Sequence, residues 1–155
     1  MPNWIEGTLK LRGNSEDLKR FFDNAIQPCA SWNPKMQKRE DFIKCDYEGG
    51  DCVVSLKRDA WVSGTRRAFV AEGCDVYWNK SYDTVCIPIR QAWAFVPENW
   101  EEISKKYNID VRLYGFESGM EFCQEVEIIA GKLTMDNEIK YDDWDWECPM
   151  PRMGG

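Results

Sequence analysis

The residues that usually carry out acid–base and metal chemistry are scarce in this sequence. The chain has 155 residues and no histidine, and histidine is the commonest general acid–base and metal ligand near neutral pH. This absence excludes a Ser-His-Asp or Cys-His catalytic site, and a mixed Cys/His zinc site, within the chain. Chemistry that uses carboxylates alone stays open, although no pair of carboxylates stands out. We therefore predict no catalytic residue, no metal ligand and no cofactor, and we keep a carboxylate-based hydrolase as an alternative.

The cysteines favour a reducing compartment. There are seven of them, an odd number, and no two have C-x-x-C spacing; they stand at positions 29, 45, 52, 74, 86, 123 and 148. The sequence begins without a basic region followed by an apolar run, and no stretch approaches the ~20 apolar residues that cross a bilayer. We expect free thiols in a protein of the bacterial cytoplasm that does not bind a membrane.

Acidic and aromatic residues gather near the end of the chain. The net charge is −7, and residues 136–147 hold six carboxylates and three aromatic rings. Exposed tryptophans flanked by acids suit docking onto a basic, partly apolar groove. The candidates for binding a protein are Asp142, Asp143, Trp144, Asp145, Trp146 and Glu147. Two other interpretations stay open, namely a solvated terminal tail and a final strand that folds back onto the body.

A second acidic surface is predicted on a strand over residues 120–130. Met120, Phe122, Gln124, Val126 and Ile128 alternate with Glu121, Cys123, Glu125 and Glu127, which is typical of a half-buried strand. The outward-facing acids are Glu121, Glu125 and Glu127. A rigid row of carboxylates could compete for a basic channel that normally holds nucleic acid. An ordinary solvated sheet face is the alternative.

A basic segment with an aromatic ring gives the opposite signal. Lys57, Arg58, Trp61, Arg66 and Arg67 fall on one predicted hairpin. Such a hairpin could grip phosphates and stack a base. A charged hairpin that faces solvent is the alternative, and an acidic chain binds free nucleic acid weakly unless the basic patch is segregated.

The elements that must position these residues follow from hydrophobic spacing. We predict a strand over residues 4–12, a helix that carries Leu18, Phe21, Phe22, Ala25 and Ile26, and an irregular insert over about 28–50. Short strands follow at 52–56 and 67–72, then a strand over 84–95, in which Pro88 indicates an edge position or a bulge. A helix is predicted from about 97 to 107, and strands over 109–115 and 120–130.

This order predicts one domain of the α+β class. We expect a ferredoxin-like fold over residues 1–135, with a mostly antiparallel sheet and two helices on one face. Residues 136–155 would form an acidic, aromatic C-terminal tail.

The sequence also resembles a known family. Pro2-Asn3-Trp4, the helix after Gly13, the segment Ala92–Pro97 and the run Glu117–Phe122 stand in the order typical of phage- and plasmid-borne proteins with an Api-type ferredoxin-like domain. The resemblance covers residues 2–27 and about 92–131. It implies a ferredoxin-like fold and an origin in a mobile element, and it supplies no catalytic residues.

Together these observations predict a protein that acts by binding rather than by catalysis. The leading hypothesis is a phage or mobile-element protein that binds and inhibits a host protein with a basic nucleic-acid-binding surface, such as a nucleic-acid-guided defence nuclease, in the manner of an anti-CRISPR protein. The alternative is a module that binds nucleic acid or nucleotide through the basic hairpin. An open sheet edge would also allow a homo-oligomer.

Overall fold

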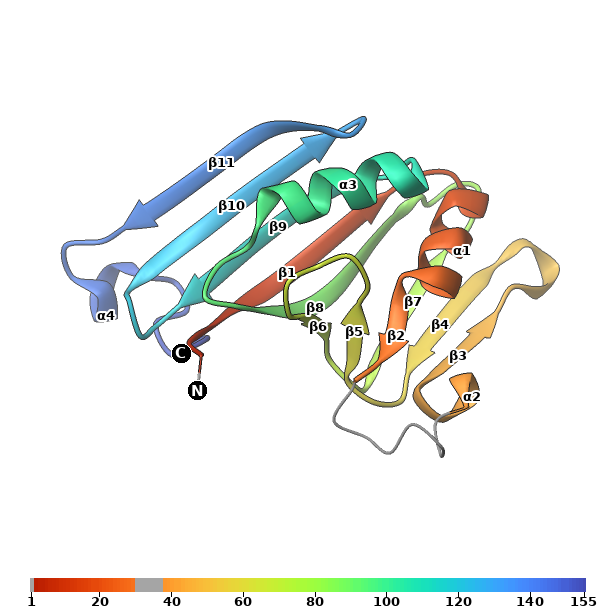
Figure 1. Cartoon of the computed structure of the whole chain (residues 1–155), viewed down its shortest axis with the longest axis horizontal. Coiled ribbons are helices and arrows are strands. Elements are labelled where there is room, and N and C mark those ends of the chain that lie inside the picture. The colour runs from red at the N-terminus through yellow and green to blue at the C-terminus, as the bar shows by residue number, and fades with distance from the viewer. Residues whose placement is uncertain (1, 30–37) are drawn as a thin grey trace.

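Two antiparallel sheets of unequal size form the body of the protein (Figure 1). The structure is a computed structural model that describes residues 2–29 and 38–155. The large sheet has eight strands in the order β11-β10-β9-β1-β8-β6-β5-β2, and the small sheet has three in the order β3-β4-β7. The strands are β1 (Trp4–Arg12), β2 (Ile26–Pro28), β3 (Ile43–Asp46), β4 (Cys52–Leu56), β5 (Ala60–Val62), β6 (Ala68–Val70), β7 (Cys74–Trp78), β8 (Thr84–Ala92), β9 (Asp110–Glu117), β10 (Phe122–Ile129) and β11 (Lys132–Lys140).

The helices α1 (Ser15–Asn24) and α3 (Pro97–Tyr107) lie on one face of the large sheet (Figure 1). Asn14 caps α1, because its side-chain oxygen accepts a hydrogen bond of 2.9 Å from the Asp17 N–H. Pro97 occupies the first turn of α3, where a missing N–H costs nothing. The remaining helices are single turns, α2 (Arg39–Phe42) and α4 (Trp144–Glu147), besides a 3₁₀ turn at Glu48–Gly50. The strand predicted over 4–12 and the helix predicted from 97 to 107 are confirmed as β1 and α3.

The predicted ferredoxin-like fold with two helices is wrong. The described residues form eleven strands and four short helices, with eight strands in a single sheet. Three strands of three residues each, β2, β5 and β6, extend the sheet beyond β8, and they are too short to show a period of two. The other end of the sheet is β11, whose side chains are almost all exposed and carry no apolar alternation. The described part of the predicted insert over 28–50 contains α2, β3 and the 3₁₀ turn.

β8 is neither an edge strand nor bulged at Pro88, contrary to the prediction, but Pro88 lies just past the point where the pairing of β8 with β6 ends. β8 lies between β1 and β6, and its register with β1 is unbroken. The N and O atoms of a residue in an antiparallel strand point to the same neighbour. The Pro88 carbonyl accepts from Ala71 N–H, just beyond the end of β6. The missing proline N–H therefore removes no bond from the ladder.

Both sheets contribute to one buried cluster. Phe22 of α1 stacks on Trp78 of β7, with the ring centroids 5.3 Å apart, and Trp78 Nε1 donates to Ser15 Oγ at 3.1 Å. Leu9 and Leu11 of β1 enter this core, whereas Lys10 between them is exposed. The side of the large sheet opposite α1 and α3, which carries Lys10, is called the open face below.

Candidate interaction surfaces

The C-terminal segment packs against the open face. Trp144 and Cys148 are buried there against Phe116 of β9 and Cys123 of β10, in a cluster separate from the main core. The indole Nε1 of Trp144 donates to the Pro151 carbonyl at 3.0 Å. The end of the chain is also held, because Gly155 N–H donates to the Trp4 carbonyl at 2.8 Å and Ser118 Oγ to the Gly154 carbonyl at 2.7 Å. The predicted tail is thus part of the folded body. Residues 136–140 end strand β11, whereas Trp144 and Trp146 lie in the one-turn helix α4 and not in a strand.

The apolar surroundings beneath α4 shift the pKa values of Cys123 and Tyr141. Burial and the neighbouring Cys148 thiol raise the pKa of Cys123 to about 12. Burial, followed by the proximity of Cys123, raises the pKa of Tyr141 to about 12. Desolvation disfavours the charged form of each group. Both groups therefore keep their protons at neutral pH and add no charge beneath α4.

Trp146 faces the opposite way from Trp144. Its side chain is 85% exposed, although α4 itself is anchored. The Asp143 side chain caps the turn by accepting from Trp146 N–H, and Cys148 N–H donates to the Trp144 carbonyl at 3.1 Å. Helical positions two apart point in different directions, so burying one ring exposes the other.

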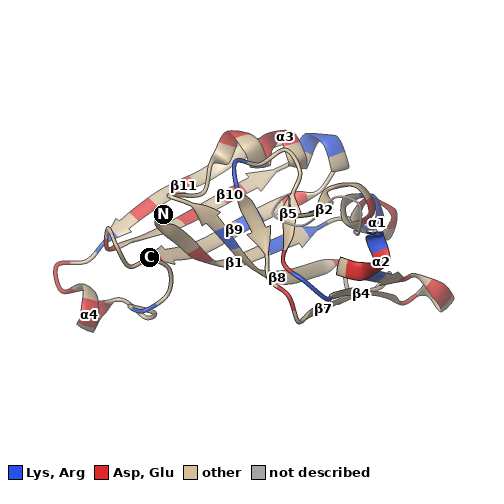
Figure 2. Ribbon diagram, turned by 60° about the horizontal axis from the view of Figure 1, so that its bottom comes forward, with Lys and Arg blue, Asp and Glu red and all other residues tan. Residues whose placement is uncertain are grey.

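Four carboxylates stand close to Trp146 in the sequence. Asp142, Asp143, Asp145 and Glu147 are all exposed, and Figure 2 shows acidic segments gathered at the end of the molecule that carries α4. Arg152 lies 3.4 Å from Asp145, between side chains that are largely exposed to solvent. We call Trp146 with these four carboxylates the acidic platform.

The other predicted acids do not join the platform. Glu125 and Glu127 lie on the open face and both approach Arg112, at 3.7 and 3.3 Å. Glu121 is exposed in the turn before β10, with a left-handed φ of 55°. The row of free carboxylates expected on this strand is thus partly neutralised.

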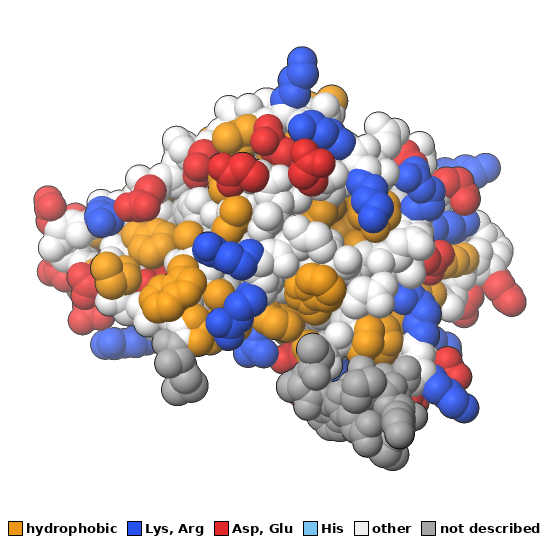
Figure 3. All heavy atoms as spheres, in the orientation of Figure 1, with side chains coloured by type: hydrophobic (Ala, Val, Ile, Leu, Met, Phe, Trp, Pro, Cys, Tyr) orange, Lys and Arg blue, Asp and Glu red, His pale blue; other side chains and the backbone are white. Residues whose placement is uncertain are grey.

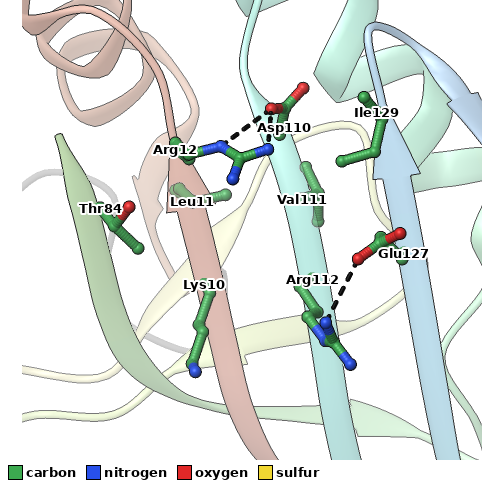
Figure 4. Close-up of a pocket in the computed structure, with 9 residues that line it drawn as sticks. All are labelled: Lys10, Leu11, Arg12, Thr84, Asp110, Val111, Arg112, Glu127 and Ile129. Atoms are coloured by element: carbon green, nitrogen blue, oxygen red, sulfur yellow. Dashed lines mark hydrogen bonds and ion pairs between the residues drawn. The ribbon is translucent and has the colours of Figure 1, made fainter.

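Two neighbouring ion pairs lie on the open face, Arg12 with Asp110 and Arg112 with Glu127 (Figure 4). Arg12 donates to Asp110 Oδ2 through Nε at 3.1 Å and Nη2 at 2.7 Å. The second oxygen of Asp110 accepts from Ala130 N–H at 3.0 Å. These groups line a pocket of about 210 Å³ together with Lys10. Arg12 and Arg112 are thus already paired with carboxylates, and no aromatic ring among the described residues lines this pocket.

The structure separates the residues of the predicted basic hairpin. Lys57 Nζ donates to the Glu40 carbonyl at 2.9 Å, and the half-buried Trp61 donates through Nε1 to the Thr65 carbonyl at 3.2 Å. Arg66 is fixed through its backbone, since its N–H donates to Asn99 Oδ1. Arg58 and Arg67 line a common hollow in the surface, and Lys57, Trp61 and Arg66 do not line it.

That hollow combines arginines with aromatic rings from distant parts of the chain. It measures about 480 Å³ and is lined by Trp4, Cys29, Arg58, Asp59, Arg67, Phe69, Glu72 and Arg90. The guanidinium carbons of Arg67 and Arg90 each lie 5.3 Å from the centre of the Trp4 ring, and Arg90 lies 5.9 Å from the Phe69 ring. Trp4 and Phe69 meet edge to face at 5.9 Å. We call this the arginine–aromatic hollow. Of its lining residues, the sequence pattern indicated only Arg58 and Arg67, because Trp4, Phe69 and Arg90 join them only through strand pairing.

Apolar surface is also exposed near the beginning of the chain. Trp93 is 53% exposed and Met120 is 64% exposed, and Trp93 N–H donates to the Asn3 carbonyl. Figure 3 shows apolar and basic side chains side by side at this end of the face that carries α3. Trp93 thus provides a second exposed tryptophan, outside the acidic platform.

Neither a cluster of metal ligands nor a membrane-spanning helix occurs in the described part of the chain. Among residues 2–29 and 38–155, no three His, Cys, Asp or Glu side chains are grouped so that they could hold a metal ion. No helix in the same part of the chain combines the length and apolarity needed to cross a bilayer.

Comparison of the chain with protein-family models, with curated proteins and with solved structures found no match. The resemblance to the Api-type family therefore stays a prediction.

Proposed function

We propose that this protein acts by binding a partner protein, and that the acidic platform is the docking element. The observation that carries the proposal is the side chain of Trp146, 85% exposed on a turn that is anchored by a buried neighbour. Exposing a tryptophan forgoes the stabilisation that its burial would give, of the order of 2 kcal/mol. Tryptophan is also the residue most enriched at binding hot spots.

The fixed position of α4 also favours binding through Trp146. A ring on a disordered tail would lose conformational entropy on binding, whereas α4 is already held by the Trp144–Pro151 hydrogen bond and the ties at Gly154 and Gly155. Ordering interface groups costs about 0.5–1.5 kcal/mol per side chain, and a preorganised site avoids part of that cost. The anchored turn favours recognition by a fixed surface over capture by a flexible tail.

The charges define the partner. Four exposed carboxylates close to Trp146 in the sequence and a net charge of −7 favour a basic surface that also contains an apolar pocket for the indole. Nucleic-acid-binding channels in proteins are basic and contain aromatic or apolar groups for stacking. A host protein of this kind, including a nucleic-acid-guided defence nuclease, fits the platform. Inhibition would follow if the platform occupies the path of the nucleic acid.

The test is affinity capture from a bacterial lysate with three forms of the protein. We expect the wild type and Trp93→Ala to retain the same partner, and Trp146→Ala to lose it. Trp93→Ala is the matched control because it also removes an exposed indole. The retained partner should elute with salt and should be displaced by an oligonucleotide that competes for its basic surface.

Retention of the same partner by Trp146→Ala at the level of the wild type would show that the platform is not the docking element. A partner that an oligonucleotide does not displace would refute the competition with nucleic acid.

A further inference from the structure

We propose that the arginine–aromatic hollow is a binding site for a nucleotide, a planar base that carries a single phosphate. The site lies on the open face and shares no residue with the acidic platform. It is therefore independent of the docking function proposed above.

Arg67 provides the anion-binding group. Its side chain is exposed and lies over Trp4, and within the described part of the chain its guanidinium has no carboxylate partner. The five N–H donors of a guanidinium match the geometry of phosphate oxygens. Arg67 also has a left-handed φ of 54°, a strained conformation for an arginine. Strain of this kind is concentrated at functional sites, where it fixes the direction of a side chain.

Arg90 provides a fixed wall. Its Nη2 donates to Asp59 Oδ2 at 2.8 Å, and its guanidinium carbon lies close to the centres of both the Trp4 and the Phe69 rings, at 5.3 and 5.9 Å. A guanidinium that is fixed beside aromatic rings adds to a surface on which a planar base can stack. The second oxygen of Asp59 accepts from Glu72 N–H at 2.9 Å, so both carboxylate oxygens of Asp59 are already engaged. Asp59 thus orients Arg90 more than it repels a ligand.

Size and charge select a small ligand over a long polyanion. The volume of about 480 Å³ falls within the range of small-molecule sites. Among the described lining residues, Arg90 is paired with Asp59, whereas Arg67 has no carboxylate partner. The net charge of −7 on the whole chain repels an extended nucleic acid. These charges suit one phosphate, on a free mononucleotide or on the end of a strand.

The test is titration of the ¹⁵N-labelled full chain with adenosine 5′-monophosphate, followed by amide and indole chemical shifts. We expect shifts centred on Trp4, Arg67 and Arg90, and at least tenfold weaker binding of adenosine and of inorganic phosphate. A 5′-phosphorylated oligoadenylate that displaces the mononucleotide would identify the end of a strand as the source of the ligand. Its failure to compete would identify a free nucleotide. Either result is compatible with the site.

The decisive variant is Arg67→Gly. Glycine adopts a positive φ without strain, so this change removes the guanidinium while relieving the backbone. We expect at least tenfold weaker binding with no loss of thermal stability. The matched control is Arg66→Ala, which removes the same charge from a residue outside the hollow and should change the affinity less than twofold. Trp146→Ala should leave nucleotide binding unchanged even if it abolishes partner capture.

The proposal is overturned if millimolar adenosine 5′-monophosphate shifts no resonance in the hollow, or if Arg67→Gly binds it as tightly as the wild type. Inorganic phosphate that binds as tightly as the nucleotide would also refute it, because the aromatic rings would then contribute nothing.

Discussion

At the scale of single residues, two tryptophans two positions apart have opposite roles. Trp144 fills the cluster on the open face and donates a hydrogen bond to Pro151, whereas Trp146 points into solvent. The sequence showed both rings among carboxylates and could not separate them, because a one-turn helix is too short to show a period. The difference becomes visible only when α4 packs on β9 and β10.

Trp144→Ala should destabilise the protein by about 3–5 kcal/mol, because it leaves a cavity between Phe116 and Cys123 and frees the Pro151 carbonyl. Trp146→Ala should change the free energy of unfolding by less than about 0.5 kcal/mol, as is usual for exposed positions. Urea denaturation followed by circular dichroism measures both values. Equal effects of the two substitutions would mean that Trp144 is not buried.

Cys123 should be the most protected thiol in this cluster. Its raised pKa leaves almost no thiolate at pH 8, and the thiolate is the reactive form. Iodoacetamide should therefore label the exposed Cys86 first and Cys123 only after unfolding, as read by peptide mass spectrometry. Rapid labelling of Cys123 in the native protein would contradict the packing of the C-terminal segment.

The raised pKa of the Cys123 thiol also makes the free energy of unfolding depend on pH. The unfolded thiol releases its proton near pH 9 and the folded thiol only near pH 12. Its contribution to stability is therefore fully present below pH 9 and is lost as the pH rises towards 12. Cys123→Ala should show a smaller loss of stability than the wild type between these values.

At the scale of the elements, close contact between β1 and β9 depends on glycine. A Cβ atom at Gly7 would collide with the Tyr114 carbonyl and the Gly115 Cα on the partner strand. Gly7→Ala should therefore cost about 2 kcal/mol or more, because a backbone rather than a flexible side chain must move. Thr8→Ala on the same strand is the control and should cost less. A Gly7→Ala protein with an unchanged melting temperature would show that the two strands are further apart.

The elements also show how far the sequence could predict the fold. Strong periodicity located β1, α1, α3, β9 and β10, because each buries one face. The edge strand β11 was missed, since its nine residues bury almost nothing, and the strands β2 and β5 are too short to carry a pattern, whereas β6 lies within the strand predicted over 67–72. Because β2, β5 and β11 were not predicted, a ferredoxin-like fold was expected, whereas the structure has one large sheet and a second, smaller one.

The candidate surfaces were predictable to a different extent. The sequence located the acidic residues of the platform, which are contiguous. It assigned Arg58 and Arg67 to a basic hairpin with Trp61, but Trp61 bonds to Thr65 instead. The aromatic partner of Arg67 is Trp4, which lies more than sixty residues earlier in the sequence. Only the register of β1, β8 and β6 brings these residues together.

At the scale of the whole molecule, the C-terminal segment divides the open face. It covers the part near Phe116 and Cys123, and leaves the arginine–aromatic hollow and the pocket beside Arg112 uncovered. The helices α1 and α3 cover the other face (Figure 1). The two proposed surfaces thus share no side chain, although the Gly155 N–H donates to the Trp4 carbonyl.

The central claim is that residues 141–155 are folded and hold Trp146 in a fixed position. Backbone ¹⁵N relaxation and hydrogen exchange of the two indole N–H groups test it most directly. We predict order parameters near ~0.85 through α4, slow exchange of the Trp144 indole and fast exchange of the Trp146 indole. Order parameters below ~0.6 over this segment, with both indoles in fast exchange, would contradict it.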